Sequence, residues 1–217
     1  MKLFKDIKKL KAIPFTHSDL VSLLGEYKNP NDKIKNMVKK GEIIRVKKEL
    51  YVAGALFRDD KISLELLANT IYGPSYVSLE WALSHYALIP ERVYEVTSIT
   101  TKMVKNYDTP FGRFSYINGN KALYPIGIVL EKNLDNTSFM IASKEKALCD
   151  KLIYTPNLGI TSQRDVREYL EEDLRIDLDD LKDFDLEIVE LCLECDYKVK
   201  LLEIFYKLLQ DLKENKL

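Results

Sequence analysis

In the N-terminal fifty residues, segments with apolar side chains at helical spacing are separated by turn-forming and capping residues. Apolar side chains recur every three or four positions in residues 3–11 and again in residues 17–24, which predicts two amphipathic helices. Thr16 followed three residues later by Asp19 resembles a capping box at the start of the second helix. Gly25, which follows that stripe, is expected to end it.

A third helix is predicted over residues 31–40, after the turn-forming Asn29-Pro30 pair. We expect Asn31 to be its N-cap and Gly41 to end it, because glycine adopts positive φ without steric cost. The apolar face of this helix is formed by Ile34, Met37 and Val38. At about 100° per residue, the opposite face and its flanks are formed by Asp32, Asn36, Lys39, Lys33, Lys35 and Lys40.

Two short strands are predicted directly after this helix, over residues 42–46 and 49–53, joined at Lys47-Lys48. A short basic helix followed by a basic hairpin is the plan of a winged helix-turn-helix, in which the helix enters the major groove and the hairpin contacts phosphates. Asn36 is the candidate for reading a base edge, since an amide pairs with adenine. The full set of candidate DNA-binding residues is Asn31, Lys33, Lys35, Asn36, Lys39, Lys40, Arg45, Lys47 and Lys48.

Beyond Gly54 the pattern mixes helices and strands. Helices are predicted over residues 61–72, 78–86, 144–154 and 163–170, and strands over residues 93–100, 112–117, 125–130 and 137–141. Apolar stripes in residues 188–192 and 199–212 predict closing helices. The fold class is therefore α+β. A winged-helix domain in residues 1–57 precedes a mixed α/β domain in residues 58–217, with a core to about 160 and an acidic helical tail in 161–217.

Charge is distributed unevenly along the chain, although the net charge is only −1. Residues 1–58 hold 14 Lys+Arg and 6 Asp+Glu, whereas the remaining residues hold 19 and 28. Most of this acidic excess lies in residues 163–217, with 9 basic and 17 acidic residues. The asymmetry predicts a nucleic-acid contact on the basic part, and it predicts that the acidic body does not itself lie along DNA.

The composition of the sequence indicates the cellular compartment in which the protein is expected. No apolar run approaches the roughly 20 residues that a membrane span needs. The lysine-rich start has no uninterrupted apolar core, so it is not expected to be a signal peptide. Three cysteines without framework spacing favour a reducing environment. A cytoplasmic protein that does not bind membranes is expected.

Metal-binding and catalytic motifs are weak in this sequence. Cys192 and Cys195 have metal-like spacing, but no second pair accompanies them, so we interpret them, with Cys149, as core cysteines. Glu80 and His85 are five residues apart on a predicted helix, a poor acid–base geometry. The carboxylates that could suggest a metal site, interpreted here as solvated residues at a helix start, are Asp177, Asp179 and Asp180. We find no phosphate-binding glycine loop and expect neither an enzyme nor a cofactor.

Two sequence blocks carry a family resemblance. The first, in residues 75–101, reads SYVSLEWALSHYALIPERVYEVTSITT, and the second, in residues 141–154, reads IASKEKALCDKLIY. Together with the predicted winged helix, they resemble the AbiEi-type antitoxins of type IV toxin–antitoxin (abortive infection) systems and related transcriptional regulators. The resemblance covers about residues 10–170.

The resemblance implies a repressor that binds inverted repeats in double-stranded operator DNA. It also implies that the C-terminal domain neutralises a nucleotidyltransferase-like toxin without forming a stable complex. An alternative is a winged-helix regulator whose body senses a ligand or binds another protein, without any toxin. An apolar pocket with convergent polar groups would favour the sensor, whereas a neighbouring toxin gene would favour the antitoxin.

Overall fold

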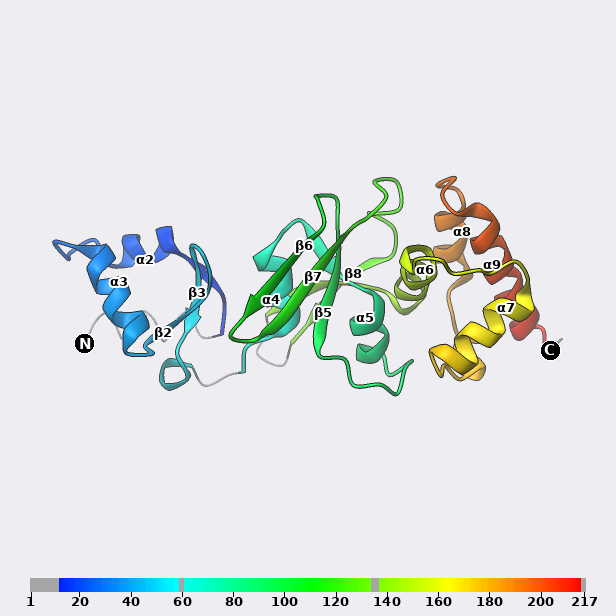
Figure 1. Cartoon of the computed structure of the whole chain (residues 1–217), viewed down its shortest axis with the longest axis horizontal. Helices are drawn as coiled ribbons and strands as arrows, with labels where there is room; N and C mark the ends of the chain where they lie inside the picture. Colours follow the sequence, from blue (N-terminus) through cyan, green and yellow to red (C-terminus); the bar gives the residue numbers. More distant parts are fainter. Residues whose placement is uncertain (1–11, 59–60, 134–136, 216–217) are drawn as a thin grey trace.

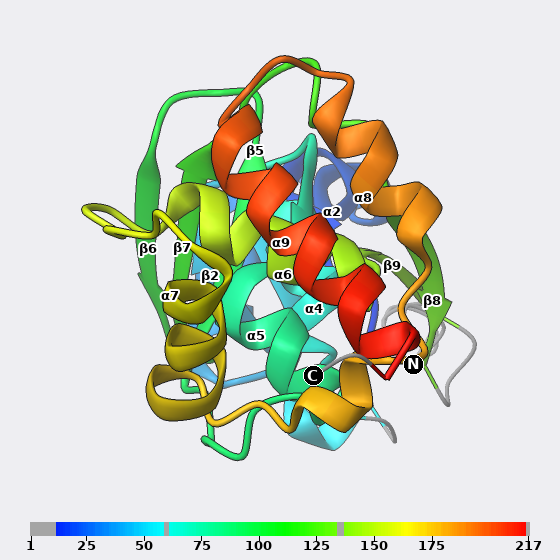
Figure 2. The same cartoon turned by 90° about the vertical axis from the view of Figure 1, so that its right-hand side faces the viewer.

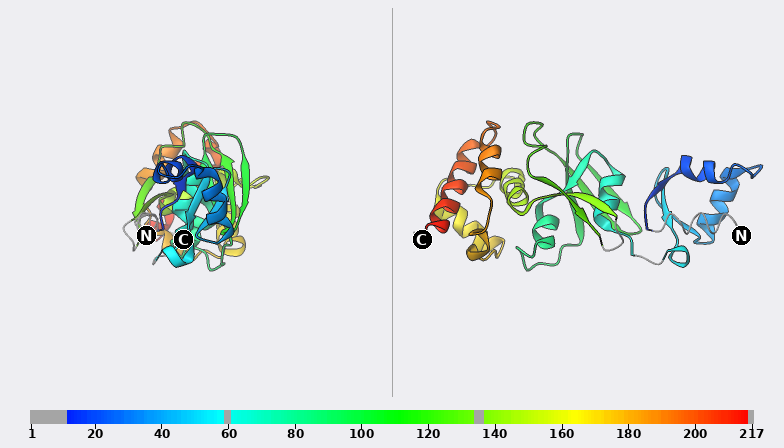
Figure 3. Two further views of the ribbon diagram at one scale, coloured as in Figure 1. Left: turned by 90° about the vertical axis from the view of Figure 1, so that its left-hand side faces the viewer. Right: turned by 180° about the vertical axis from the view of Figure 1, so that it is seen from behind.

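The computed structural model describes residues 12–58, 61–133 and 137–215, so the helix predicted over residues 3–11 lies outside the described residues. The chain is elongated and consists of three parts that follow one another along its long axis (Figure 1). A small helix-and-sheet unit lies at one end, a six-stranded sheet in the middle, and a group of helices at the other end, as the reverse view also shows (Figure 3). The structure confirms the α+β class.

The first unit contains β1 (Phe15–Thr16), α2 (His17–Leu23), α3 (Pro30–Lys39), β2 (Ile43–Lys47) and β3 (Leu50–Ala53). Its three strands are antiparallel in the order β1-β3-β2. The unit has a hydrophobic cluster of its own, contributed by both helices and the sheet: Phe15, Leu20, Leu24, Ile34, Met37, Ile43, Tyr51 and Ala53.

Helix starts and stops in this unit follow local chemistry. The capping box at α2 is confirmed: Asp19 N–H donates to Thr16 Oγ1 at 3.2 Å, and Thr16 N–H donates to Asp19 Oδ2 at 2.7 Å. The Asp19 carboxylate accepts from Thr16 N–H and also from Thr16 Oγ1, at 2.7 Å, and these two bonds, first the backbone one, lower the pKa of Asp19. Gly41 ends the third helix at φ 69°, as predicted.

The start of α3 differs from the prediction. The N-cap is Asn29 instead of Asn31, and Pro30 is the first helical residue. Proline suits this position because its fixed φ fits the helix and its missing N–H would have no intrahelical partner there. Asn31 therefore lies inside the first turn.

The β2–β3 hairpin is shared between the first unit and the rest of the chain. Its turn lies at Lys48-Glu49, where Glu49 has φ 64°, so Lys47 belongs to β2 and not to the turn as predicted. Residues on the hairpin face that points away from α3 join the hydrophobic core of the following part: Val46, Leu50 and Val52. The hairpin thereby fixes the small unit against the central sheet.

The central sheet has the order β6-β7-β5-β4-β9-β8, with β4–β9 and β5–β7 parallel and the other pairs antiparallel. Its strands are β4 (Ser75–Val77), β5 (Glu95–Thr100), β6 (Lys105–Thr109), β7 (Gly112–Asn118), β8 (Ile128–Lys132) and β9 (Ser138–Ala142). The sequence did not predict β4 and β6. The helix α4 (Leu64–Ile71) packs on β4 and β9, and α5 (Leu79–His85) packs on β5.

The last part surrounds α6 (Lys144–Tyr154), which packs against α5 on one side and α8 and α9 on the other (Figure 2). Its elements after α6 are α7 (Gln163–Glu168), the π-helical η2 (Tyr169–Asp173), the 3₁₀ turn η3 (Leu178–Leu181), α8 (Leu186–Leu193) and α9 (Val199–Lys213). The apolar stripe of α9 is buried at Leu202, Phe205, Leu208, Leu209 and Leu212. In the described part of the chain, no helix has the length and apolarity that crossing a membrane requires.

Candidate functional site

The outer face of α3 concentrates the predicted DNA-binding residues. Ile34 and Met37 are buried in the small hydrophobic cluster, which turns the opposite face to solvent. The predicted residues exposed on α3 and at its C-terminal cap are Asn31, Lys35, Asn36, Lys39 and Lys40. One helix thus presents three lysines and two amides on one side, within ten consecutive positions.

These polar side chains differ in their partners. Lys33 is half-buried with Nζ 5.6 Å from the centre of the Tyr27 ring, and Lys35 Nζ lies 3.6 Å from Asp32 Oδ1. The Asn31 Oδ1 atom is 3.0 Å from His17 Nε2, so Asn31 ties α3 to α2. Within the described residues, Lys39 and Lys40 form no ion pair, which leaves both ammonium groups available to an anion.

On the hairpin, the three predicted phosphate contacts are not equivalent. Arg45 and Lys48 are exposed, and Arg45 Nε donates to the Lys47 carbonyl at 3.3 Å. Lys47 is half-buried: its Nζ donates to the Ile71 carbonyl at 2.6 Å and lies 5.5 Å from the centre of the Tyr107 ring. Its ammonium faces the central sheet, and we expect it to hold the two parts together instead of meeting phosphate.

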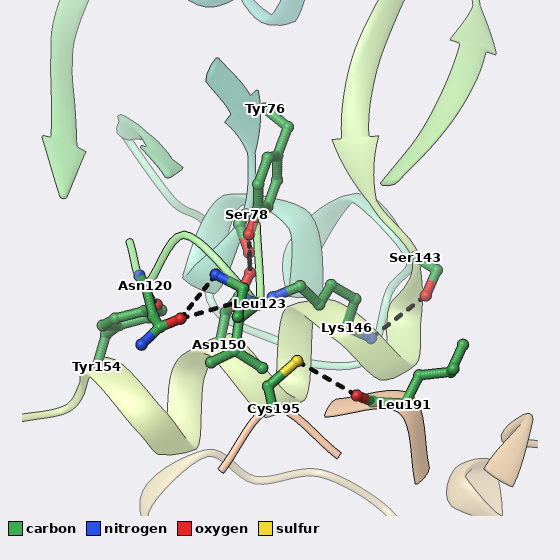
Figure 4. Close-up of polar contacts among 11 residues, drawn as sticks. Tyr76, Ser78, Asn120, Leu123, Ser143, Lys146, Asp150, Tyr154, Leu191 and Cys195 are labelled. Carbon is green, nitrogen blue, oxygen red and sulfur yellow. Dashed lines mark hydrogen bonds and ion pairs between the residues drawn. The ribbon is translucent and has the colours of Figure 1, made fainter. Parts of the chain in front are cut away.

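A second cluster, which the sequence did not single out as a site, is a buried polar network around Asp150 (Figure 4). Asp150 Oδ1 accepts from Lys146 Nζ at 2.5 Å, while Oδ2 accepts from Tyr76 Oη at 3.0 Å and from Ser78 Oγ at 2.7 Å. The side chains of Lys146 and Asp150 are fully buried. We call these four residues the Asp150 network.

Each charged or polar side chain of the Asp150 network interacts with another member of the network. Burial disfavours the charged form of Lys146, but the attraction of Asp150 outweighs it and raises the pKa of the lysine. Burial first, and then Asp150, raises the pKa of Tyr76 far above its ordinary value, so this hydroxyl remains a donor. Every polar group therefore has a partner, which is the condition under which a buried ion pair is tolerated.

The network joins the two blocks on which the family resemblance rests. Tyr76 and Ser78 belong to the first block, and Lys146 and Asp150 belong to the second. The sequence signal was the i,i+4 spacing of lysine and aspartate on a predicted helix, which places opposite charges on one face. What the sequence could not show is that this face is buried.

The other candidate groups fit roles in packing. Cys149 and Cys192 are buried, as predicted for core cysteines, and the Sγ atom of the half-buried Cys195 donates to the Leu191 carbonyl at 3.4 Å (Figure 4). His85 Nε2 lies 2.7 Å from Glu131 Oε2. Among the residues that the structure describes, no group of three or more Cys, His, Asp or Glu is arranged to hold a metal ion.

A hollow of about 380 Å³ lies where β5 and β7 meet the ends of α5 and α6. An ion pair, Lys151 Nζ to Glu80 Oε1 at 2.5 Å, lines it together with Thr97 and Tyr154. Burial opposes the charge on Lys151, but Glu80 outweighs it and raises the pKa of the lysine. Burial also raises the pKa of Tyr154 to about 12, so its hydroxyl is protonated near neutral pH.

The same chain was compared with protein-family models and with curated proteins. Neither comparison gives a match. The likeness to AbiEi-type antitoxins consequently stays a prediction that rests on the two sequence blocks. A function is therefore inferred from the geometry of α3 and of the Asp150 network.

Proposed function

We propose that the chain is a DNA-binding transcriptional regulator in which α3 is the recognition helix of a winged helix-turn-helix. The observation that carries the proposal is the outer face of α3, where Lys39 and Lys40 lack ionic partners among the described residues and Asn36 is exposed beside them. Unpaired lysines meet phosphates, and an exposed amide reads a base edge. The element order helix, helix, two-stranded hairpin supports the same assignment.

We further propose that residues 58–217 neutralise a nucleotidyltransferase-like toxin, with residues 1–57 as the DNA-binding domain. The resemblance of the two sequence blocks supports this part. Their meeting in the Asp150 network supports treating both blocks as one structural module, since Tyr76 and Ser78 reach Asp150 across more than seventy residues of sequence.

The DNA-binding proposal is tested with overlapping duplexes that tile the region upstream of the protein's own coding sequence. Lys39→Glu with Lys40→Glu places negative charge against phosphate and should abolish binding. The matched control, Lys121→Glu with Lys132→Glu, reverses two exposed lysines on the central part and should bind as the wild type does. Failure of the wild type to bind any duplex at low salt would overturn the proposal.

Asn36 gives a sharper test of base readout. Asn36→Ala should lower the preference for the best duplex over a scrambled one by about 1–3 kcal/mol, the usual worth of one good base contact. Affinity for the scrambled duplex should stay unchanged, because phosphate contacts supply it. Equal losses on both duplexes would place Asn36 outside the base-reading surface.

Neutralisation is tested in cells that carry, under separate control, a nucleotidyltransferase-like gene found beside the protein's own coding sequence; absence of such a gene would count against the antitoxin function. The Lys39→Glu, Lys40→Glu variant should still protect them, because its body is unchanged. With toxin dose held fixed, loss of protection by a variant that folds normally would show that neutralisation depends on DNA binding.

A second candidate function is ligand sensing by the body, which the hollow beside Glu80 and Lys151 favours. Its volume falls within the range of small-molecule sites. A sensor would change its affinity for the upstream duplex when the low-molecular-mass fraction of a cell extract is added, and Ser115→Trp, which narrows the hollow, would remove that response. An antitoxin of the proposed kind needs no such fraction.

A further inference from the structure

A group of lysines and tyrosines lies on the central sheet next to the hairpin. Lys105 Nζ lies 5.5 Å from the centre of the Tyr72 ring and 5.2 Å from that of Tyr107, and Lys102 Nζ lies 5.3 Å from the Tyr72 ring. Lys47 approaches Tyr107 from the hairpin side. We call Lys102 and Lys105, with the turn between β5 and β6 that carries them, the turn cluster.

The turn cluster is a local concentration of positive charge. Burial lowers the pKa of Lys47, and repulsion from Lys105 and Lys102 lowers it further, against a smaller opposing effect of Glu49. In the described residues, neither Lys102 nor Lys105 forms an ion pair with a carboxylate. Asp108 is three positions from Lys105 on β6, so it points to the opposite side of the strand.

The acidic charge of the body lies elsewhere. Residues 59–162 hold 10 basic and 11 acidic residues, so nearly all of the acidic excess lies in residues 163–217. Those residues form the helices at the end of the molecule opposite α3 (Figures 1 and 3). Their field at the turn cluster is screened, because the Debye length is about 8 Å at physiological ionic strength. The expectation that the whole body repels DNA therefore does not extend to this turn.

Strand β2 and its last residue, Lys47, connect the end of α3 to the turn cluster. Strand β2 leads from the end of α3 to Lys47, and at about 3.3 Å per residue its five residues span roughly 13–16 Å. Exposed basic side chains follow this path in the order Lys39, Lys40, Arg45, Lys48 and then the turn cluster. The turn itself is prominent, since Met103 and Val104 are 81% and 66% exposed.

We propose that the turn cluster is a second phosphate-binding surface, which contacts the backbone of the same duplex beyond the region that α3 covers. This inference rests on the proposed DNA-binding function. Lys102 spends one donor on the Gly73 carbonyl, at 2.5 Å, and keeps two for phosphate oxygens. The tyrosine faces restrict where both ammonium groups lie, which reduces the entropy lost on binding.

The test is the salt dependence of binding to a random-sequence duplex at low salt, which needs no knowledge of the operator. Lys102→Gln with Lys105→Gln keeps hydrogen-bond donors but removes both charges, and it should lower the magnitude of the log–log slope by roughly 1.8, at about 0.9 per phosphate contact. The control, Lys121→Gln with Lys132→Gln, loses the same charge and should leave the slope unchanged. Lys102→Arg with Lys105→Arg should restore it.

The outcomes separate this inference from the proposed function. If the wild type binds, Lys39→Glu with Lys40→Glu abolishes binding, and the turn-cluster variant behaves like its control, the turn cluster is not a contact and α3 remains one. If the wild type binds no duplex, the proposed function fails with it. Thermal unfolding of each variant shows whether a smaller salt slope is caused by unfolding of the protein. A slope restored to the wild-type value in the arginine variant shows that the two positive charges, and not the fold, determine it.

Discussion

Two helices of this chain carry lysines for opposite purposes. The lysines at the end of α3, Lys39 and Lys40, are exposed and have no ionic partner among the described residues, whereas Lys146 in α6 is fully buried against Asp150. Both helices carry several lysines in the sequence. The position of a lysine along a helix gives the direction of its charge, whereas tertiary packing decides whether that charge binds a partner or stabilises the fold.

Lys47 is the intermediate case. The sequence places it beside Lys48 in one basic pair, yet Lys47 reaches the Ile71 carbonyl and Lys48 is exposed. Lys47 is the last residue of β2 and Lys48 lies in the turn, so the two neighbouring side chains have different surroundings. Lys47 connects the first unit to the central part of the molecule, and Lys48 remains exposed to solvent.

The largest expected effect comes from the buried charge. Asp150→Ala leaves Lys146 buried without its counter-ion and should lower the free energy of unfolding by about 3–5 kcal/mol. Glu171→Ala, which removes the partner of Arg167 in an i,i+4 pair whose side chains are 45% and 40% exposed, should cost at most about 0.5 kcal/mol. Urea unfolding measures the free energy of unfolding of both variants. Similar losses in the two would show that burial does not determine how much an ion pair contributes to stability.

Alkaline pH should destabilise the body. Burial raises the pKa of Tyr154 to about 12, and it raises those of Tyr76, Tyr86 and Tyr116 further. Unfolded tyrosines ionise near pH 10, so between pH 10 and 12 the folded state holds protons that the unfolded state has lost. The free energy of unfolding therefore falls as pH rises, by at most about 1.4 kcal/mol per pH unit for a fully buried hydroxyl, and by less for the partly exposed Tyr86 and Tyr154.

Chemical unfolding at a series of pH values, with tyrosinate absorbance recorded in parallel, measures this fall. Tyr154→Phe should make the dependence on pH shallower, although it also removes the acceptor of the Asn120 N–H. A stability that stays constant from pH 10 to 12 would contradict the burial of these hydroxyls.

The smallest contrast is between the neighbouring lysines of the hairpin. Lys47→Ala removes the bond to the Ile71 carbonyl and should lower the free energy of unfolding by about 1–2 kcal/mol while leaving the salt slope of DNA binding unchanged. Lys48→Ala should leave stability unchanged and lower the magnitude of the slope by about 0.9. The reverse assignment of the two effects would mean that Lys47 is the residue that meets phosphate.

Much of the helical structure could be predicted because its signals are local. Thr16 with Asp19 fixes the start of α2, and Gly41 marks the end of α3 by its positive φ. The α6 boundaries at residues 144 and 154 agree with the predicted ones. In each case a side chain or a glycine acts on backbone groups only a few residues away, and a sequence shows such neighbours directly.

The features that the sequence did not predict depend on contacts between residues that are distant in sequence. The three-residue strand β4 lies between β5 and β9, and the polar edge strand β6 forms through its pairing with β7; neither has a strong period-two pattern. The Asp150 network joins residues more than seventy positions apart, and Lys47 meets a carbonyl 24 positions away. Patterns within a short window do not report such partners.

Binding of DNA by the outer face of α3 is measured most directly by a nuclear magnetic resonance titration of the 217-residue chain with duplex at low salt. We expect amide shifts to change in the region from Lys35 to Lys40, at Arg45 and at Lys48, and not in α8 or α9. Raising the salt concentration should reverse the changes. Shifts confined to the acidic helices, or none in α3 at saturating duplex, would contradict DNA binding by α3.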